Sequence, residues 1–142
     1  MIAQDSGSRA AESLLATVLT RLEAEHGDPL AALDHVTLAT RNFHDAGNTT
    51  GVRTTLGILA ALFDRLGRDE PAATITGFAL SPFTAAILPE FNTAIAHLRD
   101  VLGEATYESL ARKGETMTTA EMVTYAYDQI DQARAELNTV SK

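Results

Sequence analysis

The stretch FHDAGNTTG, residues 43–51, gathers the residue types from which a catalytic or phosphate-binding loop is made: a histidine, an aspartate, two glycines and hydroxyl side chains. A phosphate-binding loop also needs a lysine after its glycines and a strand before them. This stretch has no lysine, and the residues before it have a helical pattern. We therefore interpret it as a joint in which Gly47 ends one helix and Asn48 or Thr49 caps the next.

Histidines are the next candidates for chemistry, and they stand at positions 26, 35, 44 and 97 in a chain without cysteine. His35 and His44 are nine residues apart, about half a turn out of phase on a helix, so they face opposite directions. The chain has neither HExxH nor two histidines four residues apart. We expect no metal site and no cofactor, and histidines that are solvated or lie at helix ends.

Catalysis by other side chains has equally little support. No serine lies in a G-x-S-x-G motif, and Ser81, which precedes Pro82, is expected to end a helix. Acid pairs such as Asp69 with Glu70 fit helix starts and solvated faces. G-x4-GK[ST] does not occur, so nucleotide hydrolysis is not expected. We predict no enzyme, although catalytic groups that converge only in the fold stay open as an alternative.

The composition and net charge of the chain limit the kinds of molecule that it is expected to bind. The chain has 142 residues, about one domain, and a formal net charge of −8 without a basic cluster. Nucleic-acid binding depends on clustered Lys and Arg, so no nucleic acid is expected. The sequence has no signal-peptide pattern and no apolar run of membrane-spanning length. We expect a cytoplasmic protein that does not contact a membrane.

Apolar residues recur at three- and four-residue steps without strand-like alternation, which predicts an all-α fold of about seven helices. We expect residues 1–7 to be disordered, residues 8–137 to form one helical-repeat domain, and residues 138–142 to be a frayed tail. The first helix should bury one stripe, made of Leu14, Leu15, Val18, Leu19 and Leu22. The expected helices cover residues 8–26, 28–47, 48–66, 69–80, 89–102, 104–113 and 118–137.

The helix ends have a regular spacing. Gly27, Gly47 and Gly67 are twenty residues apart, and each should end a helix. Helices of equal length that fold back as hairpins are typical of a helical solenoid. Asp28 should cap the second helix, and Thr118 with Glu121 forms a capping box for the last one.

The hairpins resemble tetratricopeptide repeats. In the unit GDPLAALDHVTLATRNFHDAGN, the slots of the second-helix pattern are filled by Ala32, Val36 and Ala39. The first-helix slots for bulky, leucine, small and aromatic residues are filled by Leu56, Leu59, Ala60 and Phe63. The repeat departs from the family in its length of 40 rather than 34 residues and in Thr76, which occupies an aromatic slot. The resemblance implies a short right-handed solenoid of antiparallel hairpins.

From about Gly27 to Leu137 the chain also resembles the C-terminal helical region of actinobacterial signalling ATPases and of LuxR-type or adenylate-cyclase-type regulators. The segments that carry this resemblance are LGRDEPAATITGFA and LARKGETMTTAEMVTYA. It implies a non-catalytic, regulatory protein-interaction module whose catalytic and DNA-binding partners lie on other segments.

In tetratricopeptide-type solenoids the first helix of each hairpin lines the concave face. The residues of helix 48–66 that point away from its apolar stripe are therefore our candidates for partner binding: Thr54, Gly57, Ala61, Asp64 and Arg65. The expected partner is a protein or another domain, and a homodimer would cover apolar faces that so short a solenoid leaves unpaired. The alternative is a small-molecule sensor with a pocket between hairpins, which a buried Arg41 or Arg53 would favour.

Overall fold

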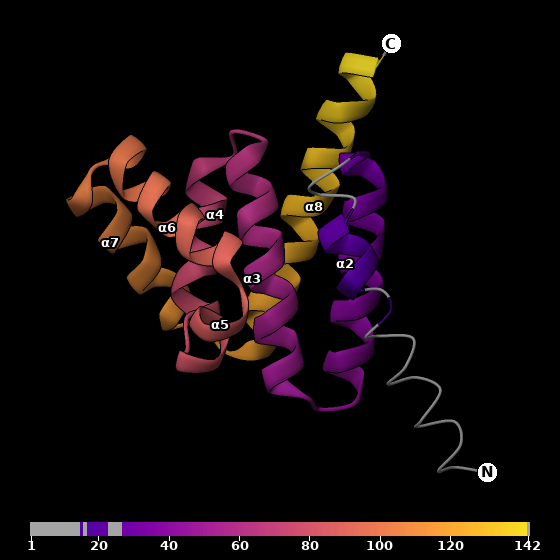
Figure 1. Cartoon of the computed structure of the whole chain (residues 1–142), viewed down its shortest axis with the longest axis horizontal. Coiled ribbons are helices and arrows are strands. Elements are labelled where there is room, and N and C mark those ends of the chain that lie inside the picture. Colours follow the sequence, from indigo (N-terminus) through magenta and orange to yellow (C-terminus); the bar gives the residue numbers. More distant parts are fainter. Residues whose placement is uncertain (1–14, 16, 23–26, 142) are drawn as a thin grey trace.

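The structure, a computed structural model, describes residues 15, 17–22 and 27–141, and within these ranges every regular element is a helix. This confirms the all-α prediction. Residues 15 and 17–22 are helical, and seven further helices follow (Figure 1): α2 (Pro29–Asp45), α3 (Thr49–Arg65), α4 (Asp69–Ala79), α5 (Pro82–Ile87), α6 (Pro89–Leu102), α7 (Glu104–Glu115) and α8 (Thr119–Ser141). No helix of the described part combines the length and apolarity needed to cross a bilayer.

The stretch FHDAGNTTG is a helix joint, as predicted. Gly47 has a φ of 72°, in the left-handed region that glycine adopts most easily. Its N–H donates to the carbonyl of His44, and the N–H of Asn48 donates to that of Phe43 at 2.8 Å, which is a Schellman motif. The side chain of Asn48 then accepts from the N–H of Gly51 and caps α3.

The same joint recurs at the next predicted helix end. Gly67 has a φ of 78°, its N–H donates to the carbonyl of Asp64, and the N–H of Arg68 donates to that of Phe63 at 2.9 Å. The two joints share backbone geometry at the spacing that the sequence predicted.

The predicted end of helix 69–80 holds, since α4 ends at Ala79. The helix that follows was not predicted, however, and the predicted boundary at Gly114 is wrong. Ser81 does not merely follow a helix: its hydroxyl accepts from the N–H of Thr84 and caps α5, a six-residue helix that apolar periodicity is too short to reveal. Gly114 does not end a helix, because it is buried inside α7. The segment expected to fray is helical as far as Ser141, and the end of α8 projects beyond the other helices (Figure 1).

The expected first helix, 8–26, lies partly outside the described residues, as does the expected disordered segment 1–7. Its predicted buried stripe is wrong at three positions, since Leu15, Val18 and Leu22 are 59%, 51% and 48% exposed. Leu19 is partly buried, and Leu14 lies outside the described residues. Arg21 joins this segment to α6 through two hydrogen bonds to Glu90, at 2.6 and 3.0 Å.

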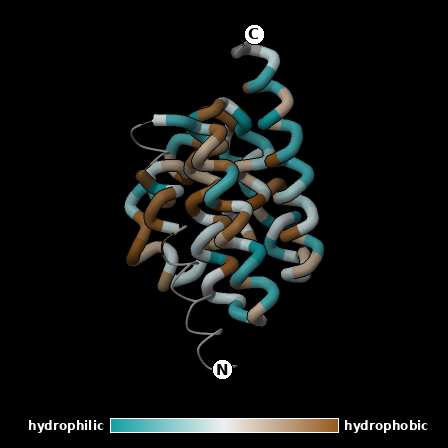
Figure 2. The backbone as a smooth tube through the Cα atoms, turned by 90° about the vertical axis from the view of Figure 1, so that its right-hand side faces the viewer, coloured by the Kyte–Doolittle hydropathy of each residue, from teal (hydrophilic) through white to brown (hydrophobic). Residues whose placement is uncertain are grey.

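The core is centred on α3, which packs against α2, α4, α5 and α6. Leu56 and Leu59 are buried as predicted, and Ile58 and Leu62 on the other side are buried as well. The wide apolar stripe of α3 is therefore covered from more than one direction. Figure 2 shows apolar and polar positions interleaved along single helices, so the core is built from helix faces rather than from wholly apolar helices.

The last helix returns to the first described hairpin. Met122, Ala126 and Ile130 of α8 are buried, and α8 packs against both α2 and α4. Arg134 of α8 also pairs with Asp34 of α2. Helices distant in sequence therefore meet, and the simple row of neighbouring hairpins implied by a solenoid is not confirmed.

Candidate functional site

The residues predicted to line an open groove on α3 do not share an exposed surface. Gly57 and Ala61 are buried. A Cβ atom at Gly57 would lie only 3.1 Å from side-chain atoms of Thr84 and Leu88, which belong to α5 and its junction with α6. The expectation that these two residues face a partner is wrong because both are buried, and the unpredicted helix α5 helps to cover Gly57.

The other three predicted residues are dispersed. Thr54 is partly buried and bonds to the carbonyl of Thr50 on its own helix, while Arg65 is exposed. Asp64 lies 2.6 Å from Nδ1 of His97, which joins α3 to α6. The hydrogen bond to Asp64 and its negative charge raise the pKa of His97.

A pocket of ≈ 490 Å³ lies where α4, α6 and α7 meet the side of α3. Aromatic and apolar side chains form part of its wall, and charged side chains form the rest. Its lining comprises Arg53, Gly77, Phe78, Leu80, Arg99, Tyr107, Glu108, Ala111, Arg112, Glu115 and Met117. We call this the α4–α7 pocket. It combines an apolar surface with convergent polar groups, as small-molecule sites do.

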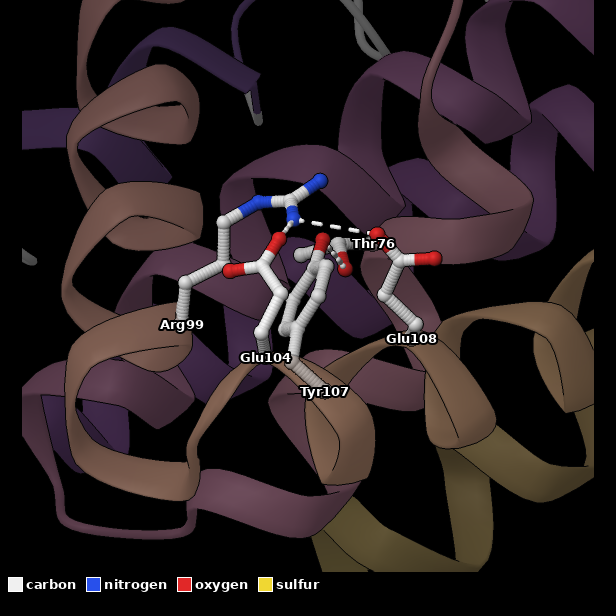
Figure 3. A network of polar contacts seen from close by, with 5 residues as sticks. All are labelled: Thr76, Arg99, Glu104, Tyr107 and Glu108. Carbon is white, nitrogen blue, oxygen red and sulfur yellow. Dashed lines mark hydrogen bonds and ion pairs between the residues drawn. The ribbon is translucent and has the colours of Figure 1, made fainter.

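Tyr107 of α7 anchors the α4–α7 pocket. Its side chain is almost fully buried, and its hydroxyl lies 2.8 Å from that of Thr76 on α4 (Figure 3). The single proton of the Thr76 hydroxyl is donated to the carbonyl of Ala73, at 2.7 Å. Tyr107 must therefore be the donor to Thr76, which gives an ordered chain of hydrogen bonds from α7 into α4.

Arg99 of α6 covers the ring of Tyr107. Its guanidinium carbon lies 4.7 Å from the ring centroid, a cation–π arrangement. One of its nitrogens pairs with Glu104 and, at 3.3 Å, with Glu108 (Figure 3). One terminal nitrogen of Arg99 is thus engaged by two acids, whose negative charges lie beside its positive charge.

Arg53 of α3 has a different environment. It is partly buried, and its guanidinium carbon lies 5.0 Å from the centroid of the Phe78 ring. It forms no ion pair with an acid of the described residues. From the sequence, burial of Arg53 or Arg41 against a cavity is expected to favour a small-molecule sensor. Arg53 lines the pocket, whereas Arg41 is exposed and does not.

A second hollow, of ≈ 550 Å³, lies between the end of α3 and α8. Its charged residues, Arg68 and Glu136, pair with each other. The remaining lining is Leu66, Ala133, Ala135, Leu137 and Thr139. With its charges satisfied internally, this hollow offers a ligand fewer free polar groups than the α4–α7 pocket.

The chemistry of the α4–α7 pocket favours binding over proton transfer. Its three arginines stay protonated in proteins and cannot act as bases. Glu108 is engaged by Arg99, and Glu115 is exposed. Among the residues that the structure describes, no three His, Asp or Glu side chains are grouped so that they could hold a metal.

Local sequence patterns gave no signal for this pocket. Tyr107 and Phe78 belong to different helices. Phe78 lies in the segment LGRDEPAATITGFA, but the resemblance that this segment carries gave it no binding role. Gly77, which lines the pocket, and Gly114, which also lies at the α4–α7 contact, let α4 and α7 come close, but an isolated glycine reads equally well as a helix end. Of the residues that line the pocket, the sequence predicted a binding role only for Arg53, and only if it were buried against a cavity.

Comparison with known proteins places no further constraint on this pocket. No family model, no curated protein and no solved structure matches the chain. The resemblance to tetratricopeptide-like regions of signalling regulators therefore stays a prediction.

Proposed function

We propose that this chain is a non-catalytic regulatory module that binds a small molecule in the α4–α7 pocket. The observation that carries the proposal is Arg53, which is held against Phe78 at the pocket wall and pairs with no acid of the described residues. A partly buried charge without a counter-charge is costly, and a ligand that pairs with it recovers part of that cost.

Ligand binding in the α4–α7 pocket would affect helices beyond the pocket itself. The pocket takes residues from α3, α6 and α7, so one ligand would join three helices that otherwise meet through separate contacts. The helix α4, which forms another wall, also packs against α8. A ligand that stabilises these walls would therefore also stabilise the contact between α4 and α8.

A fragment screen tests this proposal. We would record ¹H–¹⁵N spectra of the whole chain with neutral, cationic and anionic fragments and follow the amides of Gly77, Tyr107 and Ala111. We expect a subset of fragments to shift these signals in a saturable way. Ala111→Leu, which places a larger side chain in the pocket wall, should weaken the response, whereas Ala105→Leu at an exposed position of α7 should not.

The proposal fails if no fragment class gives saturable shifts at these amides, or if Ala111→Leu and Ala105→Leu respond alike. Shifts confined to the hollow beside α8 would also count against it, because they would place the binding site elsewhere.

A protein partner is the second candidate function, and the short helix α5 favours it. Leu80, Phe83 and Ile87 are 53%, 51% and 39% exposed, and they lie within eight residues of one another. We propose that another domain, as in the signalling regulators that the sequence resembles, or a second copy of the chain covers these residues. Light scattering of the native chain and of Phe83→Ser tests the second copy: a monomer at all concentrations in both proteins would exclude a homodimer.

A further inference from the structure

We infer that the α4–α7 pocket selects an anionic ligand, a carboxylate or a phosphate on an apolar body, through Arg53 and Arg112. This inference rests on the proposed function and adds the chemical class of the ligand. It depends on which hydrogen-bonding groups in the pocket are still free to bind.

The two arginine–aromatic pairs differ in what their guanidinium groups can still do. Stacking on a ring uses the face of the guanidinium and leaves its N–H donors, which point outward in its plane, available. In Arg99 one terminal nitrogen pairs with both Glu104 and Glu108, so two acids already lie against its positive charge. In Arg53, whose guanidinium carbon lies over the Phe78 ring, no acid of the described residues pairs with the guanidinium. Phe78 therefore restrains Arg53, and no described residue engages its donor edge.

Arg112 of α7 is the second free cation at the pocket. Its side chain lines the pocket and is exposed, and it forms no ion pair or side-chain hydrogen bond with a described residue. A planar carboxylate or a phosphate can accept two parallel N–H bonds from a guanidinium, which makes such pairs stronger than bonds between neutral groups.

The acids around the pocket determine how selective it can be. Glu108 is paired with Arg99, which leaves Glu115 as the one unpaired acid in the described lining against two unpaired arginines. The whole chain has a net charge of −8. Its general field therefore repels anions, and attraction to one must come from short-range contacts in this pocket.

The rest of the lining specifies the body of the ligand. Phe78, Leu80 and Met117 offer an apolar wall on which a ring or short aliphatic group can pack. A bare inorganic ion would use the arginines but leave this wall uncovered. The expected ligand therefore joins one anionic group to an apolar body.

Isothermal titration of the whole chain with matched probes tests the inference. The probes are benzoate, phenyl phosphate, their neutral counterpart benzamide, and inorganic phosphate alone. We expect benzoate or phenyl phosphate to bind at least about tenfold more tightly than benzamide, the factor that corresponds to one charge-assisted contact. Inorganic phosphate should bind more weakly than phenyl phosphate, and the ratio of benzoate to phenyl phosphate identifies the preferred anion.

Arginine variants show which guanidinium groups contact the anionic part of the ligand. Arg53→Met and Arg112→Met should each remove most of the preference for the anion over benzamide. Arg65→Met on α3 and Lys113→Met on α7 make the same charge change outside the pocket lining and should preserve it. If Arg53→Met fails to fold, Arg53→Lys keeps a cation but loses the planar fork, and the preference should fall by a smaller factor.

Equal affinity for benzamide and benzoate, or equal loss in the pocket and control variants, would overturn the inference. Either result leaves the proposed function standing if neutral fragments still bind at Gly77 and Ala111. Absence of binding by every fragment class would instead remove both.

Discussion

Gly77 of α4 and Gly114 of α7 make reciprocal contacts with the backbone of the opposite helix. A Cβ atom at Gly77 would lie 1.8 Å from the carbonyl oxygen of Ala111, and one at Gly114 would lie 1.8 Å from that of Thr74. Each helix therefore meets the other at a position where only glycine fits. The pair holds α4 and α7 close along one edge of the α4–α7 pocket.

Replacing either glycine with alanine should destabilise the fold. Alanine would normally stabilise a helix interior by about 1 kcal/mol relative to glycine. Here the added methyl group meets backbone, which cannot move aside by a rotamer change, so we expect a net loss of about 2 kcal/mol or more in the free energy of unfolding. Urea denaturation of Gly77→Ala and Gly114→Ala measures it.

Gly57→Ala is the matched control for these two variants. Its methyl group would meet side-chain atoms of Leu88, Thr84 and Phe91 at 3.1 to 3.2 Å, and these can shift by a few tenths of an ångström. We expect its stability to lie within about 1 kcal/mol of the parent. If all three variants lost the same stability, close backbone contact between α4 and α7 would not be the cause.

The sequence predicted helix ends well where a glycine acts locally. Gly47 and Gly67 end helices through their own φ angles and the hydrogen bonds around them, and such signals lie within a few residues. Gly114 was misread because its purpose lies in contact with Thr74, forty residues away in the chain. A single sequence cannot distinguish a glycine that turns the chain from one that admits another helix.

Variants at Gly47 measure the cost of a positive φ angle alone, because an added side chain there would meet no neighbouring atoms. Nothing lies within 4 Å of a Cβ atom placed there, so only the positive φ opposes a side chain. Gly47→Ala should cost about 1 to 2 kcal/mol in the free energy of unfolding, the penalty of a left-handed residue. Gly47→Asn should cost less, because asparagine adopts this region more readily. Thermal and urea unfolding of the two variants should rank them in that order, and the reverse order would contradict the assignment.

The hydroxyl pair of Tyr107 and Thr76 should behave as one coupled unit. Tyr107→Phe leaves Thr76 bonded to the carbonyl of Ala73, so we expect a loss of about 1 kcal/mol. Thr76→Val leaves the buried hydroxyl of Tyr107 without its hydrogen-bond acceptor. It should therefore lower the free energy of unfolding by more, about 1 to 3 kcal/mol.

The double variant Thr76→Val with Tyr107→Phe provides the decisive measurement. Because both partners are then apolar, the combined loss should be smaller than the sum of the single losses. Strict additivity would mean that the 2.8 Å contact contributes nothing of its own.

The candidate pocket was less predictable than the helices because its parts come from four elements. Arg53 has the same sequence neighbourhood as any surface arginine on α3, and only Phe78 beside it reveals its restraint. Gly57 was expected to be exposed and is buried, because α5, which packs over it, was not predicted. Missing one short helix thus placed part of the expected site on a covered face.

The pair of Asp64 and His97 gives a pH dependence whose direction follows from the structure. The pKa of His97 is raised above 6.5 by Asp64, chiefly through their hydrogen bond, with smaller contributions from Asp69 and Asp100. A group whose pKa is raised on folding stabilises the fold below its unfolded pKa, and that stabilisation is lost as pH rises through the folded value. The stability gap between the parent chain and His97→Gln should therefore be largest below about pH 6.5, the ordinary pKa of histidine, and shrink as the pH rises through the raised pKa of the folded state.

Two Asp→Asn variants distinguish the effect of the hydrogen-bonded Asp64 on the pKa of His97 from that of more distant negative charges. Asp64→Asn removes both the hydrogen-bonding carboxylate and its charge, so it should return the NMR-titrated pKa of His97 toward its usual range and flatten the pH dependence of the gap. Asp100→Asn removes a charge that acts on His97 only through space, so its effect should be smaller. An unchanged His97 titration in Asp64→Asn would show that the contact between α3 and α6 is not an ion pair in solution.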